Sequence, residues 1–172
     1  VYNTTTDTLI KHISSSFVGA EAQQVVLDKN KQVWVSLGSY TNTAGFLIVN
    51  AATLEITTQI TEPKLSFEGD LALSADRGTV YFIQADGIVG GQTAEVPTYI
   101  YAVDVTNFQV STSPVCSGVG FYGLAVQPTT GYLYTANVNG FITDSMTYLY
   151  ASSGSKITEF MTGVGTCRFV FK

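Results

Sequence analysis

Charged side chains that could contact a ligand stand immediately before short apolar runs. Glu68 and Asp70 flank Gly69, and two carboxylates at this spacing could bind a cation, act as acid and base, or form a solvated turn. Arg168 could hold an anionic group through both arms of its guanidinium, or form a salt bridge with one of those carboxylates. These positions predict ion binding or simple charge pairing.

Aromatic side chains accompany the charged ones. Tyr122 and Tyr40 could offer a platform to a planar or sugar-like ligand, and Phe121 is a third candidate. Packing inside the fold is an equal alternative for Phe121, because it directly precedes an apolar run.

Catalytic and metal-binding patterns are lacking. His12 is the only histidine, so neither a Ser-His-Asp arrangement nor a histidine zinc site is supported. Cys116 and Cys167 match no metal-ligand spacing, and no phosphate-binding glycine motif follows a strand. We therefore predict no catalytic residue, metal or cofactor in this segment.

Composition narrows the class of protein. The 172 residues are 45% hydrophobic and 12% charged, as in a folded domain. The net charge of −5 and the lack of a basic cluster argue against nucleic acid as a partner. No apolar run approaches 18 residues, so we expect no membrane span.

A repeat organises the chain. Four apolar runs end at Leu27, Leu73, Val126 and Phe171, at spacings of 46, 53 and 45 residues. A second landmark, the residue after a strand, recurs at Asn3, Asn50, Asp104 and Ala151, at spacings of 47, 54 and 47. Each is followed by a predicted outer strand, at 8–13, 54–60, 108–115 and 156–161. Because the two landmarks drift together, they mark one repeated unit of four short strands.

A period in the forties with four strands per unit is typical of a β-propeller blade. The uncharged run of each unit predicts an innermost strand that is buried on both faces. Trp34, Tyr81 and Tyr134 recur on the second strand, where large side chains would fill the space between blades.

The predicted segments are a partial blade at residues 1–14, blades at 20–61, 67–115 and 120–162, and a last innermost strand at 165–172. This set predicts the C-terminal part of a longer propeller whose other blades would cover its open faces. Two alternatives remain: a four-bladed ring closed by the two end segments, and a larger ring made from two copies of the chain. Cys116 and Cys167 fall at different radii, so we expect two free, partly buried thiols.

The links that precede the innermost strands, and the loops after the second strands, should meet at one mouth of the channel. Matched rim positions differ in chemistry, whereas the strand positions after them stay apolar. We therefore predict a ligand site among Glu68, Asp70, Tyr122, Arg168, Tyr40, Gln84, Asp86 and Asn137.

Three sequence stretches resemble a known repeat. L-A-L-S-A-D-R-G-T-V-Y-F at 71–82, I-Y-A-V-D-V-T-N-F-Q-V at 100–110 and the two G-V-G links resemble bacterial YVTN-type, YncE-like propeller repeats. Phe121 and Thr166 replace the proline usual in the link, and Arg168 replaces its glycine.

This resemblance implies a seven-bladed propeller of the surface-layer or Bacteroidetes surface-protein kind. It places the protein at the cell surface or in the periplasm, and it is compatible with a lipid anchor upstream. It implies a noncatalytic propeller that binds a small ligand or partner at the channel mouth. The alternatives are a quinoprotein-like dehydrogenase or lyase, with catalytic residues in other blades, and a purely structural scaffold.

Overall fold

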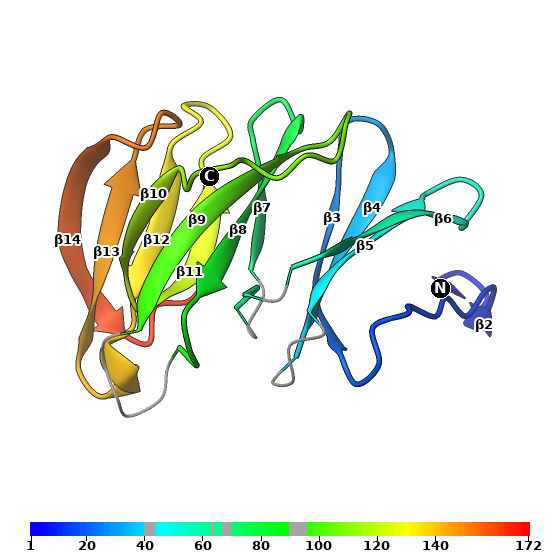
Figure 1. Cartoon of the computed structure of the whole chain (residues 1–172), viewed down its shortest axis with the longest axis horizontal. Helices are drawn as coiled ribbons and strands as arrows, with labels where there is room; N and C mark the ends of the chain where they lie inside the picture. The colour runs from blue at the N-terminus through cyan, green and yellow to red at the C-terminus, as the bar shows by residue number, and fades with distance from the viewer. Residues whose placement is uncertain (40–43, 63, 67–69, 90–95) are drawn as a thin grey trace.

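The chain is all-β in the computed structural model, which describes residues 1–39, 44–62, 64–66, 70–89 and 96–172. These residues form three four-stranded antiparallel sheets and one two-stranded hairpin. Within them, the one helical element is a short 3-10 turn, η1 (Asn139–Phe141). The sheets follow one another along the long axis, with the hairpin at one end and the last sheet at the other (Figure 1).

Each sheet is a meander whose strands pair in chain order, as short connections between antiparallel strands require. Sheet 1 contains β3 (Glu21–Leu27), β4 (Gln32–Gly38), β5 (Gly45–Asn50) and β6 (Ile56–Thr61). Sheet 2 contains β7 (Leu71–Leu73), β8 (Thr79–Ala85), β9 (Pro97–Asp104) and β10 (Cys116–Val119). Sheet 3 contains β11 (Phe121–Val126), β12 (Leu133–Asn137), β13 (Asp144–Tyr150) and β14 (Lys156–Val164). The hairpin contains β1 (Tyr2–Asn3) and β2 (Thr8–Leu9).

Large apolar side chains fill the space between sheets 1 and 2. Trp34 of β4 is fully buried, and its ring lies 6.1 Å from that of Phe46 and 5.9 Å from that of Phe108. Phe108 follows β9, so Trp34 packs across the boundary between the two sheets, as predicted for the aromatic of the second strand. Burying such a side chain contributes roughly 2–3 kcal/mol to folding.

A second cluster joins sheets 2 and 3. Tyr81 and Ile83 of β8 pack with Phe121 of β11 and Leu133 of β12. Phe121 is fully buried, and its ring lies 5.7 Å from Tyr148. Phe121 is therefore a core residue and cannot belong to the predicted aromatic platform.

Buried hydrogen bonds fix the turn after β3. Asp28 is 2% exposed, and its carboxylate accepts hydrogen bonds from the backbone N–H of Asn30 and Gln32 and from the indole of Trp34. The Asn30 amide in turn donates to the Val105 carbonyl in sheet 2 at 3.2 Å. This turn therefore helps to set the angle between the first two sheets.

Two outer strands differ from their predicted positions. The strand expected at 108–115 begins at Cys116 instead, and only an isolated bridge joins Val103 to Val110. Pro114 has no N–H to donate, which explains why the ladder starts after it. The strand expected at 8–13 ends at Leu9.

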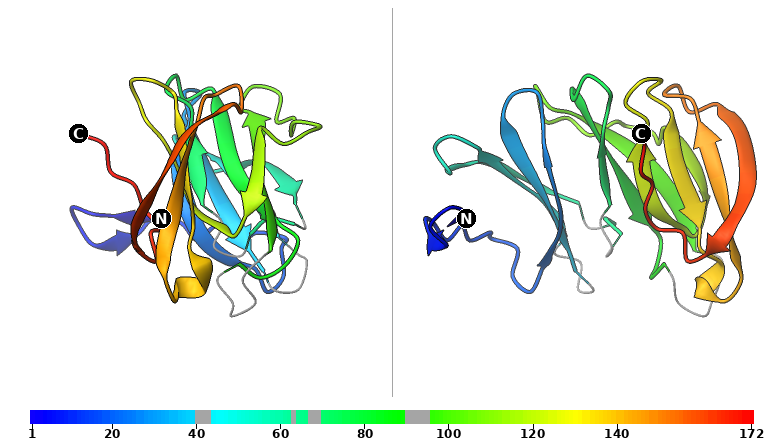
Figure 2. Two further views of the ribbon diagram at one scale, coloured as in Figure 1. Left: turned by 90° about the vertical axis from the view of Figure 1, so that its left-hand side faces the viewer. Right: turned by 180° about the vertical axis from the view of Figure 1, so that it is seen from behind.

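Residues 165–172 form no strand, contrary to the prediction. A strand needs a hydrogen-bonded partner, and none of the described strands pairs with this segment in a ladder. The segment runs as an irregular chain beside sheet 3 (Figure 2). The rings of Phe169 and Phe171 contact that of Tyr134, at 5.7 and 5.1 Å, so packing holds the segment on the sheet.

One face of sheet 1 is open. Val25 of β3 is 60% exposed, whereas the corresponding Leu71 and Leu124 are 3% and 6% exposed. Leu27 is 40% exposed, whereas the corresponding Val126 of sheet 3 is 9% exposed. The prediction of burial on both faces is therefore wrong for β3, because only the N-terminal segment, and no four-stranded sheet, lies on that side. Its apolar face instead borders a cavity of about 440 Å³.

Both cysteines are free, as predicted. Cys116 is buried between sheets 2 and 3, and burial raises the pKa of its thiol to about 12. Cys167 is half-buried in the C-terminal segment.

Candidate functional site

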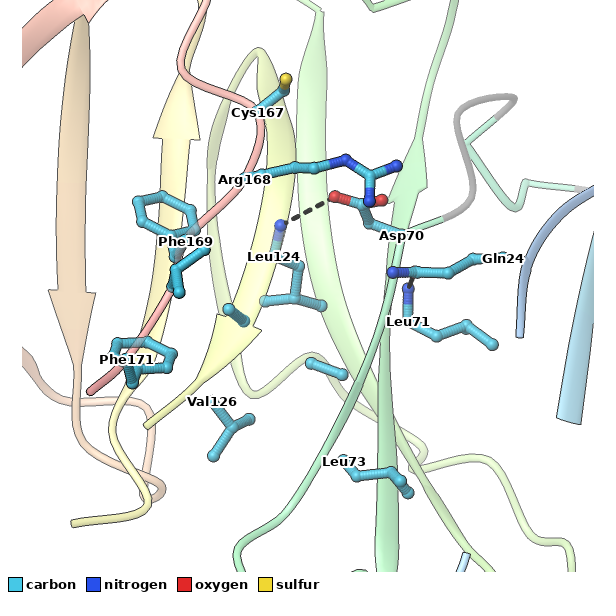
Figure 3. A pocket seen from close by; sticks show the side chains of 13 residues that line it. Gln24, Asp70, Leu71, Leu73, Leu124, Val126, Cys167, Arg168, Phe169 and Phe171 are labelled. Atoms are coloured by element: carbon cyan, nitrogen blue, oxygen red, sulfur yellow. Dashed lines mark hydrogen bonds between the residues drawn. The ribbon is translucent and has the colours of Figure 1, made fainter. Parts of the chain in front are cut away.

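The candidate site is a cavity lined by the first strands of successive sheets. β7 lies against both β3 and β11, and residues 167–171 continue the series (Figure 3). The cavity measures about 340 Å³. Its lining consists of Gln24, Asp70, Leu71, Ala72, Leu73, Leu124, Ala125, Val126, Cys167, Arg168, Phe169, Val170 and Phe171.

Polar side chains gather at one end of this cavity. Asp70 accepts a hydrogen bond from the backbone N–H of Leu124 at 3.1 Å, which joins sheet 2 to sheet 3. Gln24 accepts one from the backbone N–H of Leu71, which joins sheet 1 to sheet 2. Gln24 and Asp70 are 46 residues apart, the same spacing as the ends of their strands, so the two bonds are equivalent.

Arg168 brings a positive charge to the same end. Its side chain is exposed, and Figure 3 shows its guanidinium directed toward the Asp70 carboxylate. Within the described part of the chain, this guanidinium has no hydrogen-bond or ion-pair partner within the usual distance limits. It is therefore available to an anion that enters the cavity.

The rest of the cavity wall is apolar. Leu73 and Val126 lie toward the far end, and Phe169 and Phe171 line the side formed by the C-terminal segment, with their rings against Tyr134 (Figure 3). A polar end with an apolar wall suits a small molecule with an ionised group and a hydrophobic body.

A β-bulge shapes the entrance at β11. The pairing register shifts between Phe121 and Gly123, and Tyr122 is the bulged residue. β3 shifts equivalently between Ala22 and Gln24. Bulges redirect side chains, and here the Tyr122 ring meets that of Phe141 edge to face, with centroids 5.0 Å apart.

The predicted site residues separate into groups. Asp70 and Arg168 lie together in the cavity, and Tyr122 lies in β11, two residues before the lining residue Leu124. Gly123 fits only because it lacks a side chain, since a Cβ there would lie 2.5 Å from the Cys167 carbonyl oxygen. Glu68 and Tyr40 lie outside the described residues.

Three other predicted residues do not line this cavity. Asp86 forms an ion pair with Lys64 at 2.7 Å and accepts a hydrogen bond from Tyr99, and the bond from Lys64 lowers the pKa of its carboxyl. Gln84 hydrogen-bonds the side chain of Glu62, a carboxyl whose pKa burial raises. Asn137 accepts a hydrogen bond from the backbone N–H of Asn139 at 2.8 Å, so it shapes the next loop.

Asp70 and Arg168 are the only cavity-lining residues that were predicted, so the other lining residues were missed, as was Phe141 beside Tyr122. Gln24 could have been found because it aligns with Asp70 in the repeat. Phe141 carried no such signal, because its contact with Tyr122 depends on the course of a loop.

Other chemistry is sparse in the described residues. They contain no group of three histidine, cysteine, aspartate or glutamate side chains placed to hold a metal ion. His12 lies on the N-terminal segment, where its ring contacts the Ser14 hydroxyl at 3.2 Å. Nor do these residues form a helix with the length and hydrophobicity needed to cross a membrane.

Comparison with solved structures defines the class. The chain resembles the β-propeller domain of the Trilobed protease from Pyrococcus furiosus, with a TM-score of 0.57 and 13% identity over 83% of the chain and 43% of that domain. It also resembles a gluconolactonase from Xanthomonas campestris, with a TM-score of 0.58 and 11% identity over 89% of the chain and 51% of that enzyme. An acylaminoacyl peptidase gives a TM-score of 0.60 and 10% identity over 87% of the chain and 26% of the peptidase.

The fold is therefore of the β-propeller class. The chain spans from about a quarter to a half of the length of these three proteins. No protein-family model matches the sequence, and no curated protein does. At such low identities the likeness concerns the fold alone.

Proposed function

We propose that this chain is part of a noncatalytic β-propeller that binds a small anionic ligand at the mouth of its channel. One observation carries the proposal: the exposed guanidinium of Arg168 lies in the cavity of the first strands without a hydrogen-bond or ion-pair partner among the described residues. Arginine can donate two parallel hydrogen bonds to a carboxylate or phosphate. Gln24 and Asp70 give the cavity further polar atoms, and its apolar wall accommodates the ligand body.

We further propose that each sheet is a blade and that more blades complete the ring, to about seven as the YVTN-type resemblance implies. The exposed Val25 and Leu27 support this, because the corresponding residues of sheets 2 and 3 are covered by a neighbouring sheet. On this proposal the partners of the chain are further blades of its own protein. The location at the cell surface or in the periplasm rests on the same resemblance.

Enzymatic activity is the second candidate function. Two structural neighbours are described as a gluconolactonase and an acylaminoacyl peptidase, which motivates this alternative. Any catalytic group would have to come largely from other blades, because the cavity offers one carboxylate and one thiol from this chain, Asp70 and Cys167. Turnover of a bound ester or lactone by the full-length protein would favour the enzyme.

A charge-matched pair of variants tests the binding proposal. Full-length protein, Arg168→Gln and Lys156→Gln are titrated with acetate and with phosphate, followed by NMR chemical shifts. Lys156 lies on the outer strand β14 in an exposed pair with Glu159, so its variant removes the same charge elsewhere. We expect Arg168→Gln to weaken binding by about 10-fold or more, as for a charged hydrogen-bonded group, and Lys156→Gln to have little effect. Equal affinities in all three proteins would refute the site.

A further inference from the structure

An unusual loop lies beside the entrance of the cavity. Asn139, Gly140 and Phe141 are three consecutive residues with positive φ, at 45°, 63° and 61°. Asparagine and glycine adopt this region readily, whereas it is unfavourable for a bulky residue such as Phe141. Leu54 and Phe108 also adopt it, each at a single position in a turn. Such a conformation of a bulky residue persists only where surrounding contacts enforce it.

Several hydrogen bonds enforce the conformation. The Asn137 side chain accepts from the backbone N–H of Asn139, and the Asn139 amide donates to the Asp144 carbonyl at 2.6 Å. The backbone N–H of Phe141 donates to the carbonyl of Val138, whose side chain is 1% exposed. The loop is therefore anchored at its base while Phe141 remains 40% exposed.

The loop presents its ring to Tyr122. The two rings meet at an interplanar angle of 89° with centroids 5.0 Å apart. Tyr122 reaches this position through the bulge in β11, whereas the equivalent bulged residue of β3 is Gln23. The aromatic pair thus belongs to sheet 3 alone among the bulges that the structure describes.

The same pair adjoins the segment that carries Arg168. A Cβ built on Gly165 would lie 3.0 Å from Phe141, and one on Gly123, next to Tyr122, would lie within 2.6 Å of the Cys167 backbone. Residues 165–167 therefore pass close to the aromatic pair, and the next residue is Arg168.

We propose that Tyr122 and Phe141 form an aromatic shelf against which a ring of the ligand packs, on the face of one side chain and the edge of the other, while the ligand's acidic group binds Arg168. The proposal rests on the function proposed above and narrows the ligand to a ring-bearing anion. An aromatic ring and a pyranose ring share the required chemistry, because both present C–H groups or a π-face to an aromatic side chain.

Three probes separate ring from charge in the full-length protein: benzoate, D-glucuronate and acetate. We expect at least one ring-bearing probe to bind more tightly than acetate. The probe that binds more tightly identifies the ring as aromatic or pyranose.

Variants of the shelf complete the experiment. Phe141→Leu keeps an apolar side chain without the ring, and we expect it to weaken the preferred ring probe roughly three- to tenfold and to leave acetate unchanged. Phe141→Tyr should restore the affinity. Phe160→Leu is the control, because Phe160 is similarly exposed, at 44%, on the outer strand β14. Tyr122→Leu should act as Phe141→Leu does, and thermal melts verify that each variant is folded.

The outcomes distinguish the two proposals. If all three probes bind equally, or if Phe141→Leu has no effect while Arg168→Gln weakens every probe, the shelf is refuted and the anion site stands. If Arg168→Gln has no effect on any probe, the anion site itself is refuted.

Discussion

The Asp70 carboxylate accepts a hydrogen bond from the backbone N–H of Leu124, and this bond ties the first strand of sheet 2 to that of sheet 3. Gln24 makes the equivalent bond to the N–H of Leu71 one sheet earlier. The repeat thus places a side-chain acceptor at the same position in two sheets. Arg168 aligns with these acceptors two units after Asp70, with Gly123 at the position between them. A guanidinium can only donate, which is why we propose that this position binds an anion.

The bond between sheets 2 and 3 predicts a difference between two substitutions at Asp70. Asp70→Ala removes the acceptor and should lower the free energy of unfolding by about 1–2 kcal/mol. Asp70→Asn keeps a carbonyl oxygen and should cost less. Urea denaturation measures both, and equal losses would show that the charge, not the acceptor, is what stabilises the boundary.

Buried Asp28 should matter more to stability than an exposed aspartate with similar bonds. Asp28→Ala leaves two backbone N–H groups and the Trp34 indole without an acceptor, and we expect a loss of about 2–4 kcal/mol. Asp104 accepts from the backbone N–H of Thr106 and Asn107 in an exposed turn, where water can replace the acceptor, so Asp104→Ala should cost clearly less than Asp28→Ala. Similar losses in the two variants would contradict the role given to burial.

The buried hydroxyl of Thr135 should lower the stability of the fold. It is fully buried, and its hydroxyl has no hydrogen-bond partner among the described residues. Thr135→Val replaces the hydroxyl by a methyl group of similar size and should raise stability by about 1 kcal/mol. In the control, Thr147→Val should lower it, because the buried Thr147 hydroxyl contacts that of Thr162 at 3.0 Å. Thermal melts compare the two, and a lower melting temperature for Thr135→Val would refute the idea.

Alkaline pH should destabilise the fold through Cys116. Burial raises the pKa of this thiol from an ordinary value of 9.0 to about 12. Between these two values the unfolded chain binds fewer protons than the folded one, so stability falls as pH rises, by at most about 1.4 kcal/mol per pH unit for one group. Burial also raises the pKa of Tyr150 from 10.0 to about 12, which adds a loss above pH 10.

Denaturation curves between pH 8 and 11 measure this dependence. Cys116→Ala should show a shallower decline above pH 9 than the unchanged protein, whatever its absolute stability. Parallel declines would assign the pH dependence to other groups.

The sequence predicted the β architecture well because the same pattern of strands and turns recurs in each repeat. The matched apolar runs located β3, β7 and β11, and Trp34 was correctly placed between sheets. The strand expected at 165–172 failed because pairing depends on a partner strand, which the composition of the segment cannot reveal.

Only those site residues that hold matched positions in the repeat could be predicted from the sequence. Asp70 and Arg168 hold aligned or adjacent rim positions, and both line the cavity. Asp86 pairs with Lys64, and Phe121 is buried in the core. Neither outcome could be predicted, because each depends on residues distant in sequence or on the facing sheet. Phe141 was missed because Asn139-Gly140 indicates a turn with positive φ but not which side chain the loop then brings against Tyr122.

Locating a bound ring-bearing anion tests the central claim most directly. Crystals of the full-length protein soaked in 4-iodobenzoate would give the position of the iodine by anomalous scattering and that of the carboxylate by electron density. We predict the carboxylate within hydrogen-bond distance of the Arg168 guanidinium, and the ring against Tyr122 and Phe141. A molecule bound instead along the outer strand β14, or on the apolar face around Val25, with the cavity empty, would contradict the account.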